Sequence, residues 1–388
     1  MRSAPVSPSH RLLLVAGAAV ALALGACSGG GGAPGGGGGG FADLAVAPDL
    51  AVAPDLATPP DLATRDLAGG GGTDGGLPAA IIVDHTSIPL FDKIPDRFLA
   101  AARATRVLFS DRSVGQNIHE SLDCLTAAAW SSAPAFCRRD YYAIDNMNTW
   151  LWKTYSQADF QANQVPARIL FAPDPVKYNR ANWTFELRTG DFEELVQNFV
   201  QDLVPKYVAT KDVLSFQFSY LNIEFNSPIA DPKAGYFVDQ PHFGYYPNKE
   251  RWDISDIEAV EAKYPQKVFL LWTSSLSRSL GSASGTAFND QMRQYARTRR
   301  RALLDMADIE AHDDKGKPCY DNRDGVPYCG TSCENYPDDG KSEPAICQDY
   351  TTEVDGGHLG SVSAGRIRIA KAFWVVMARI AGWDGVSP

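Results

Sequence analysis

The sequence has no excess of positive charge, no long apolar run and no linker inside its C-terminal part. Its 46 Asp and Glu residues outnumber 36 Lys and Arg, which gives a formal net charge of −10. No basic, aromatic-studded stripe is present, so nucleic acid is not expected as a partner. The apolar run near the start is too short to span a bilayer as a stable helix. Residues 77–388 continue without a second linker, which predicts one large domain.

The N-terminal segment has the features of an export signal. Arg2 and Arg11 precede the apolar run, which ends in Leu24-Gly25-Ala26-Cys27. This ending resembles the lipobox of bacterial lipoproteins, in which the cysteine thiol accepts a diacylglyceryl group. The resemblance implies a signal peptide over residues 1–26 and a chain anchored to membrane lipid through Cys27, at the outer membrane and facing the periplasm or the cell surface. A plain secretory signal with an accidental cysteine is the alternative.

A low-complexity segment follows over residues 27–76. It consists of a glycine tract and a six-residue repeat that begins at Asp43, Asp49, Asp55 and Asp61. A proline in nearly every repeat prevents a continuous helix. We expect a disordered, semi-extended stalk that holds the domain away from the lipid surface.

The remaining cysteines are even in number, which in an exported chain indicates disulfides. They are Cys124, Cys137, Cys319, Cys329, Cys333 and Cys347. We expect Cys124 to pair locally with Cys137. The last four lie in an insertion at about residues 312–350, where the connectivity stays open and a zinc site is an alternative.

Short apolar runs alternate with amphipathic helical segments across the domain. We expect strands at residues 106–109, 168–171, 212–218, 267–272 and 303–309, and helices near residues 114–122, 192–204 and 365–383. Alternation of this kind predicts an α/β fold: a doubly wound, mostly parallel five-stranded sheet with helices on both faces, a three-layer sandwich. Ligands of such sheets bind beyond the carboxyl ends of the strands.

Three polar groups follow expected strands or precede the last helix. Ser113 lies between the first strand and its helix, Asn222 follows the third strand, and Asp355 and His358 stand in an Asp-x-x-His before the last helix. A serine in a strand-to-helix turn is exposed, and its backbone N–H can point at an oxyanion. The alternatives are a helix N-cap for Ser113, a turn residue for Asn222 and a surface turn for the Asp/His pair.

This order of residues resembles the SGNH (GDSL-type) hydrolase superfamily, which has its nucleophilic serine in the first block and Asp-x-x-His in the last. The stretch SVGQNI from Ser113 is similar to one variant of that family. Further matches are FNDQMRQYA from Phe288 and DIEAHDDKGKP from Asp308, and the resemblance covers roughly residues 106–383.

The resemblance implies a catalytic triad and an oxyanion hole. Ser113 would be the nucleophile, His358 the general base and Asp355 the residue that orients it, with neither a cofactor nor a metal. The backbone N–H of Ser113, the side-chain amide of Asn222 and Asn182 would form the oxyanion hole. The chain departs from the family in having Asp111-Arg112-Ser113 instead of Gly-Asp-Ser, and Tyr220-Leu221-Asn222-Ile223 instead of Gly-x-Asn-Asp. Arg112 points into solvent or binds an acidic group of the substrate.

Two other functions remain open. The first is a metal site, because acidic residues and a histidine gather at residues 308–314 and in DNRDG from Asp321. The second is a non-catalytic module that binds carbohydrate or another surface ligand through aromatic side chains. Its candidate residues are Trp150, Trp152, Tyr245, Tyr246 and Trp252. His85 is expected to be structural.

Together these observations predict an exported, membrane-anchored serine esterase. It would hydrolyse an ester by forming an acyl-enzyme, with O-acylated carbohydrate as one possible substrate class.

Overall fold

The structure is a computed structural model. It describes residues 77–144, 150–190, 192–218, 229, 252–276, 283–320, 327–329, 333–335, 342–352, 357–360 and 362–386. The signal peptide, Cys27 and the stalk predicted over residues 1–76 lie outside the described residues.

The centre of the domain is a parallel sheet of six strands. Its order is β1-β8-β7-β6-β2-β5, and every pairing between neighbours is parallel. The strands are β1 (Ile81–Val83), β2 (Val107–Asp111), β5 (Trp183–Leu187), β6 (Val213–Gln217), β7 (Val268–Trp272) and β8 (Ala302–Leu304). The expected α/β class with a parallel sheet is confirmed, with six strands rather than five.

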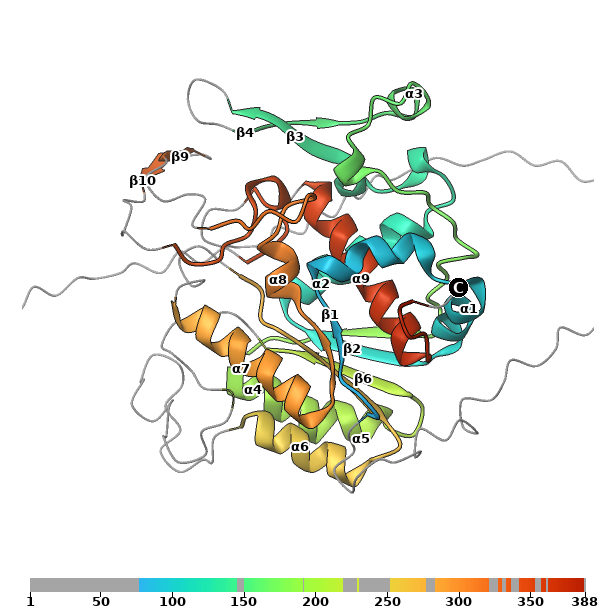
Figure 1. Ribbon diagram of the computed structural model, residues 1–388, viewed down its shortest axis with the longest axis vertical. Helices are drawn as coiled ribbons and strands as arrows, with labels where there is room; N and C mark the ends of the chain where they lie inside the picture. Colours follow the sequence, from blue (N-terminus) through green and yellow to red (C-terminus); the bar gives the residue numbers. More distant parts are fainter. Residues whose placement is uncertain are drawn as a thin grey trace, which may run out of the picture. The chain divides into compact units, whose positions relative to one another are not determined.

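Helices cover both faces of this sheet (Figure 1). On one face lie α1 (Asp96–Ala104), α2 (Ser113–Thr126) and α9 (Ser363–Ile380). On the other lie α4 (Phe192–Asn198), the π-helical turn η6 (Phe199–Leu203), α5 (Val204–Tyr207), α6 (Ile254–Lys263) and α7 (Ala283–Arg299). The short helix α8 (Met306–Glu310) follows β8.

Apolar side chains of the strands alternate between two cores, because successive residues of a strand point to opposite faces. In β2, Phe109 packs with the α1, α2 and α9 side, whereas Leu108 packs with the α4 to α7 side. In β7, Trp272 and Leu271 divide in the same way. Both strands are buried throughout, and they are mostly apolar, as parallel strands covered on both faces are expected to be.

Two strand predictions differ from the structure, and two strands of the sheet, β1 and β5, were not predicted. Residues 168–171 form no strand: a 3-10 turn, η5 (Ala167–Ile169), leads into loop, and Ile169 and Phe171 are buried there. The strand beside β2 is instead β5, whose side chains are only half-buried because it is the edge of the sheet. The strand predicted at residues 303–309 ends at Leu304, where Asp305 caps α8 by accepting a hydrogen bond from the backbone of Asp308.

The smaller elements lie outside the sheet. They are the 3-10 turns η2 (His85–Lys93), η3 (Trp130–Ser132), η4 (Ala135–Cys137) and η9 (Gln348–Tyr350), the helix α3 (Gln157–Gln161), and two antiparallel hairpins, β3 (Arg139–Ile144) with β4 (Trp150–Thr154) and β9 (Pro327–Cys329) with β10 (Cys333–Asn335). Figure 1 shows β3 and β4 above the layer that contains α9.

Two disulfides join cysteines of the described residues. Cys124–Cys137 is the predicted local pair, and Cys319–Cys347 closes the insertion. The second bond removes two of the four cysteines considered as zinc ligands. Cys329 and Cys333 face each other in the register of the β9–β10 hairpin.

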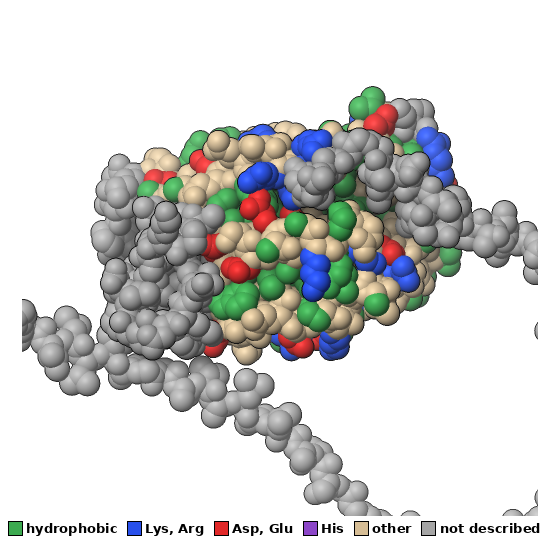
Figure 2. Space-filling view, turned by 90° about the horizontal axis from the view of Figure 1, so that it is seen from below, with side chains coloured by type: hydrophobic (Ala, Val, Ile, Leu, Met, Phe, Trp, Pro, Cys, Tyr) green, Lys and Arg blue, Asp and Glu red, His purple; other side chains and the backbone are tan. Residues whose placement is uncertain are grey.

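The surface shown in Figure 2 lies on the side of α4 to α7. There, acidic, basic and apolar side chains are interspersed across the described residues, without a continuous patch of one charge.

Candidate active site at the carboxyl edge of the sheet

Ser113 stands at the point where β2 passes into α2. The strand ends at Asp111, and Arg112 is the N-cap of the helix. Ser113 is the first residue of α2, and its side chain is exposed. The alternative of Ser113 as the N-cap is therefore wrong. The turn is tight, since a Cβ built on Gly115 would lie 2.4 Å from the Cβ of Asp111. Only glycine lets the helix begin this close to the end of the strand.

His358 reaches the serine from the other end of the chain. Its Nε2 lies 2.7 Å from Ser113 Oγ, across 245 positions of sequence. This is the distance of a good hydrogen bond, and it is the geometry in which an imidazole can take the proton of a serine hydroxyl. The structure thus brings together two of the three predicted triad residues.

The backbone around His358 is held by three hydrogen bonds from other elements. The carbonyl of Gly357 accepts from Ser275 Oγ at 2.6 Å, and that of His358 accepts from Thr351 Oγ1 at 2.7 Å. The N–H of Leu359 donates to Asn117 Oδ1 at 3.1 Å. Because Asn117 belongs to α2, the helix that carries the serine also fixes the loop that carries the histidine.

A buried carboxyl lies behind the first of these bonds. Glu310, in α8, is within 3.1 Å of Ser275 Oγ through both its oxygens, and its Oε2 accepts from the N–H of Leu276 at 2.8 Å. Burial raises the pKa of Glu310 to about 8, although hydrogen bonds from Leu276 and Ser275 favour its ionised form. Glu310, Ser275 and Gly357 form a hydrogen-bonded chain that ends next to His358.

Asp111 is a second buried carboxyl, at the base of the Ser113 turn. Burial raises its pKa to about 7, against the backbone hydrogen bonds of Arg112 and Gly115 and the nearby charges of Arg112 and His358. Its Oδ2 is buried and has no hydrogen-bond partner in the structure. Sequence reasoning treated Asp111 only as a departure from the family motif and missed that it interacts with His358.

The oxyanion residues have different outcomes. Asn222 and the triad residue Asp355 lie outside the described residues. The prediction that Asn182 belongs to the oxyanion hole is wrong. Asn182 precedes β5, so it lies at the amino edge of the sheet, and its side-chain amide donates to the carbonyl of Arg103 at 2.8 Å. Because β2 and β5 are parallel, residues before β5 lie at the opposite edge from Ser113.

Gly190 is the residue that the structure places near this site instead. It follows β5, the neighbour of β2, and its φ of +126° is one that glycine adopts readily. Arg112 is partly buried and donates a hydrogen bond from Nη1 to the carbonyl of Gly190. Gly190 could have been found from its position shortly after WTFEL, residues 183–187, if that run had been predicted as a strand.

The aromatic residues proposed for a binding module are only partly described. Trp152 in β4 is 44 % exposed, and Tyr142 in β3 is 60 % exposed. The guanidinium of Arg139 lies over the ring of Trp152, 5.9 Å from its centre. Trp252 packs against the core beside α6. The side chains of Trp150, Tyr245 and Tyr246 lie outside the described residues.

The acidic segment 308–314 does not gather around one point. Glu310 turns inward to Ser275, and Asp313 Oδ1 accepts the backbone N–H groups of Lys315 and Lys317. Asp308 and His312 instead meet His85, which ring stacking and hydrogen bonds hold in place. The segment from Asp321 lies outside the described residues.

Comparisons with known proteins identify no relative. No protein-family model, no curated protein and no solved structure matches the chain. Among the described residues, no helix has both the length and the apolar character needed to cross a membrane.

Proposed function

We propose that this protein is a serine esterase with an SGNH-like active site. The observation that carries the proposal is the 2.7 Å contact between Ser113 Oγ and His358 Nε2 at the carboxyl edge of a parallel sheet. A free hydroxyl is a poor nucleophile, and a neutral imidazole at this distance is the group that activates it. The exposure of Ser113 leaves the hydroxyl accessible to an ester.

The reaction proceeds through an acyl-enzyme. Ser113 Oγ attacks the ester carbonyl carbon while His358 Nε2 takes the hydroxyl proton. The imidazolium then gives this proton to the leaving alcohol oxygen as the tetrahedral intermediate collapses. A water next attacks the acyl carbon and gives a proton to Nε2, and the acid leaves as that proton returns to Ser113. The residue that we assign to accept the Nδ1–H of His358 and to stabilise the imidazolium is Asp355.

Donors for the oxyanion come from the ends of adjacent strands. We assign one to the backbone N–H of Ser113, the first residue of α2, and one to the backbone N–H of Gly190 after β5, with Asn222 as a third. The proximity of Gly190 to the Ser113 turn, through the hydrogen bond from Arg112, supports this set.

We further propose that the enzyme is exported and anchored through a lipid on Cys27, and that the stalk over residues 27–76 presents it to O-acylated carbohydrate or another ester. The exposed aromatic residues Tyr142 and Trp152 support a sugar ligand. The same observation favours the second candidate, a glycan-binding protein that does not hydrolyse.

The test is hydrolysis of p-nitrophenyl acetate and of an acetylated glycan. Because the acyl-enzyme needs the serine oxygen, Ser113→Ala should lower kcat/KM by about 10³-fold or more. The matched control is Ser131→Ala, an exposed serine in η3, which should leave the rate unchanged. A fluorophosphonate probe should label the peptide that contains Ser113 in the parent protein.

Equal hydrolysis by the parent and the Ser113→Ala protein would refute the assignment. If neither ester is cleaved and the probe does not react, the binding role gains support, and affinity of the Trp152→Ala protein for the glycan becomes the deciding measurement.

A further inference from the structure

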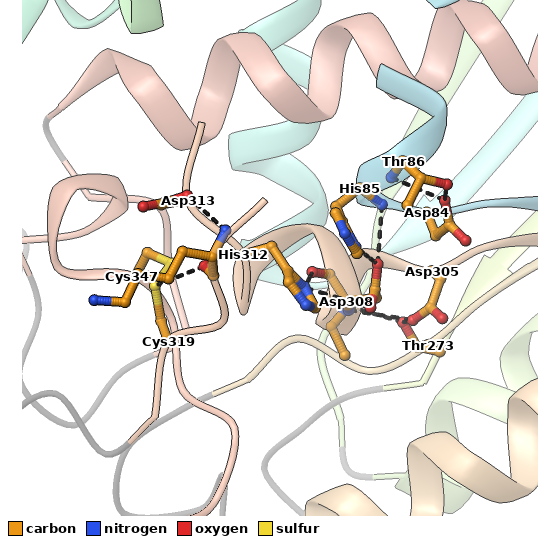
Figure 3. A network of polar contacts seen from close by, with 12 residues as sticks. Asp84, His85, Thr86, Thr273, Asp305, Asp308, His312, Asp313, Cys319 and Cys347 are labelled. Atoms are coloured by element: carbon orange, nitrogen blue, oxygen red, sulfur yellow. Dashed lines mark hydrogen bonds and ion pairs between the residues drawn. A yellow bond between two sulfur atoms is a disulfide. The ribbon is translucent and has the colours of Figure 1, made fainter. Parts of the chain in front are cut away.

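A second cluster of functional side chains lies at the same edge of the sheet, away from Ser113. His85 begins η2 directly after β1, and Asp308 and His312 belong to α8 and the turn that follows it. Because β1 and β8 are neighbouring parallel strands, the residues after them meet at their carboxyl ends. Figure 3 shows the three side chains together, between the Cys319–Cys347 disulfide on one side and Asp305 and Thr273 on the other.

Hydrogen bonds determine which nitrogen of each imidazole carries a proton. His85 Nδ1 lies 2.5 Å from Asp308 Oδ2, and the backbone N–H of His85 donates to the same oxygen at 2.9 Å. His312 Nδ1 lies 2.7 Å from the backbone carbonyl of Asp308. A carboxylate and a carbonyl oxygen can only accept, so we assign the proton to Nδ1 in both rings. In the neutral form of each histidine, Nε2 then has a free lone pair.

This is the arrangement that metal-binding histidines show in proteins. The nitrogen that does not bind the ion donates to a carboxylate or a backbone carbonyl, which fixes the tautomer and the ring orientation. Here one aspartate supplies both acceptors.

The two rings are also stacked. Their centres lie 3.6 Å apart, and their planes differ by 12°. Two imidazolium ions repel each other at this separation, so the arrangement favours at least one neutral ring. One ligand atom can be chosen from each of His85, Asp308 and His312 such that all three lie within 4.8 Å of one another. Because the rings are nearly parallel, one of them has to turn out of the stack before both Nε2 atoms can reach one ion.

The surroundings hold the cluster in place and give access to it. Asp308 and His312 line a pocket of about 140 Å³, together with Asn289, Arg293 and Tyr320. The charge of Arg293 is compensated by Asp305 and Asp290, with which it forms ion pairs at 2.6 and 2.7 Å.

The turn after α8 is fixed by the chain around it. The N–H of Cys319 donates to the carbonyl of Ala311 at 2.7 Å, and His312 pairs with Pro318 in an isolated bridge. The Cys319–Cys347 disulfide closes the same region.

We propose that His85 and His312 bind a divalent transition-metal ion through Nε2, with Asp308 as the residue that orients both imidazoles, Zn²⁺ being the best fit. Imidazole nitrogens suit Zn²⁺, whereas Ca²⁺ and Mg²⁺ are bound by oxygen. Water or a small ligand takes the remaining coordination positions. In the sheet order, β7 and β6 separate β8 from β2, so this site is distinct from Ser113. The ion ties η2 to α8 and the insertion, and it does not depend on ester hydrolysis.

The test measures zinc bound by untagged protein after dialysis against EDTA. The chain allows a matched variant, His85→Asn with His312→Asn, because the asparagine amide keeps a donor near the position of Nδ1 but has no counterpart of Nε2. We expect the parent protein to bind one Zn²⁺ at this site by titration calorimetry, and the double variant to bind it at least about 100-fold more weakly. Zn²⁺ should raise the Tm of the parent protein and not that of the variant.

Controls separate this site from other histidines. His119→Asn, on α2, and His358→Ala should bind zinc as the parent protein does. Co²⁺ should give visible absorption bands that the double variant lacks, and far-UV circular dichroism should show that the variant is folded. The proposal is overturned if the folded parent protein binds no zinc, or if the folded double variant binds it with the same affinity as the parent.

Discussion

Single residues determine whether the proposed esterase site is assembled, and several of them are buried. Ser275 donates to the carbonyl next to His358, and Glu310 contacts the hydroxyl of that serine. Since both residues are buried, no water replaces them if they are lost. The position of the proposed general base, His358, thus depends on a buried carboxyl group.

Glu310 should make stability fall as pH rises. Its pKa is about 8 in the folded protein against 4.5 for an ordinary glutamate, so between these values the folded state holds a proton that the unfolded chain releases. This contribution is complete below pH 4.5, and it is lost as pH rises through about 8.

Glu310→Gln removes the titration and keeps the shape of the protonated group. In urea unfolding, the free energy of the parent protein should fall relative to this variant by up to about 1.4 kcal/mol per pH unit in that window. The control is Glu258→Gln on α6, which removes a carboxylate that is paired with Arg299 of α7. Parallel pH profiles for the parent and Glu310→Gln would contradict the expectation.

At the scale of elements, the segments that carry the proposed chemistry are joined by side chains near their ends. The disulfide Cys124–Cys137 links α2 to η4. Ser363, the first residue of α9, donates to the carbonyl of Phe136 at 2.6 Å and accepts from the N–H of Arg139 at 2.7 Å. The helix after Ser113 and the helix after His358 are therefore connected through η4.

Removal of this disulfide should destabilise the domain. A crosslink that closes a loop of this size contributes roughly 3 kcal/mol, mainly by restricting the unfolded chain. We expect Cys124→Ala with Cys137→Ala to lower the free energy of unfolding by about 2–4 kcal/mol in denaturant titrations. Treatment of the parent protein with a reductant should lower the free energy of unfolding further, because the Cys319–Cys347 bond is reduced as well. A double variant as stable as the parent would show that the Cys124–Cys137 bond is dispensable.

Elements with a strong apolar pattern could be predicted from the sequence, and those without it could not. β2, β6 and β7 are mostly apolar and buried throughout because both faces of the sheet are covered, and their positions were predicted. β5 was missed because an edge strand alternates less clearly, and its neighbour Gly190 was missed with it. The strand predicted at residues 168–171 is wrong because apolar side chains of loops also pack into the core.

The candidate sites divide in the same way. Ser113 and His358 were found because their order along the chain resembles a known family. His85 was interpreted alone, since its contact with Asp308 spans 223 positions and no local spacing reveals it. Asn182 was assigned to the wrong edge of the sheet because the strand that follows it was not recognised.

At the scale of the whole molecule, the proposed attachment is separate from the folded domain. The stalk and Cys27 precede the first described residue, Leu77. If Cys27 carries the lipid, Cys27→Ala should move the protein from the membrane fraction to the soluble fraction and abolish incorporation of labelled palmitate. The neighbouring Ser28→Ala protein should stay in the membrane fraction. A Cys27→Ala protein that still sediments with membranes and carries label would rule out this attachment.

The bond between Cys124 and Cys137 also has a consequence in time. Such a bond does not persist in a reducing compartment, and we propose that it forms only after export to an oxidising one. Before that transfer, α2, which carries Ser113, and η4, which is hydrogen-bonded to α9, lack their covalent link. We therefore expect the proposed esterase to be less active during synthesis and to mature at its destination, so that acyl esters inside the cell are spared.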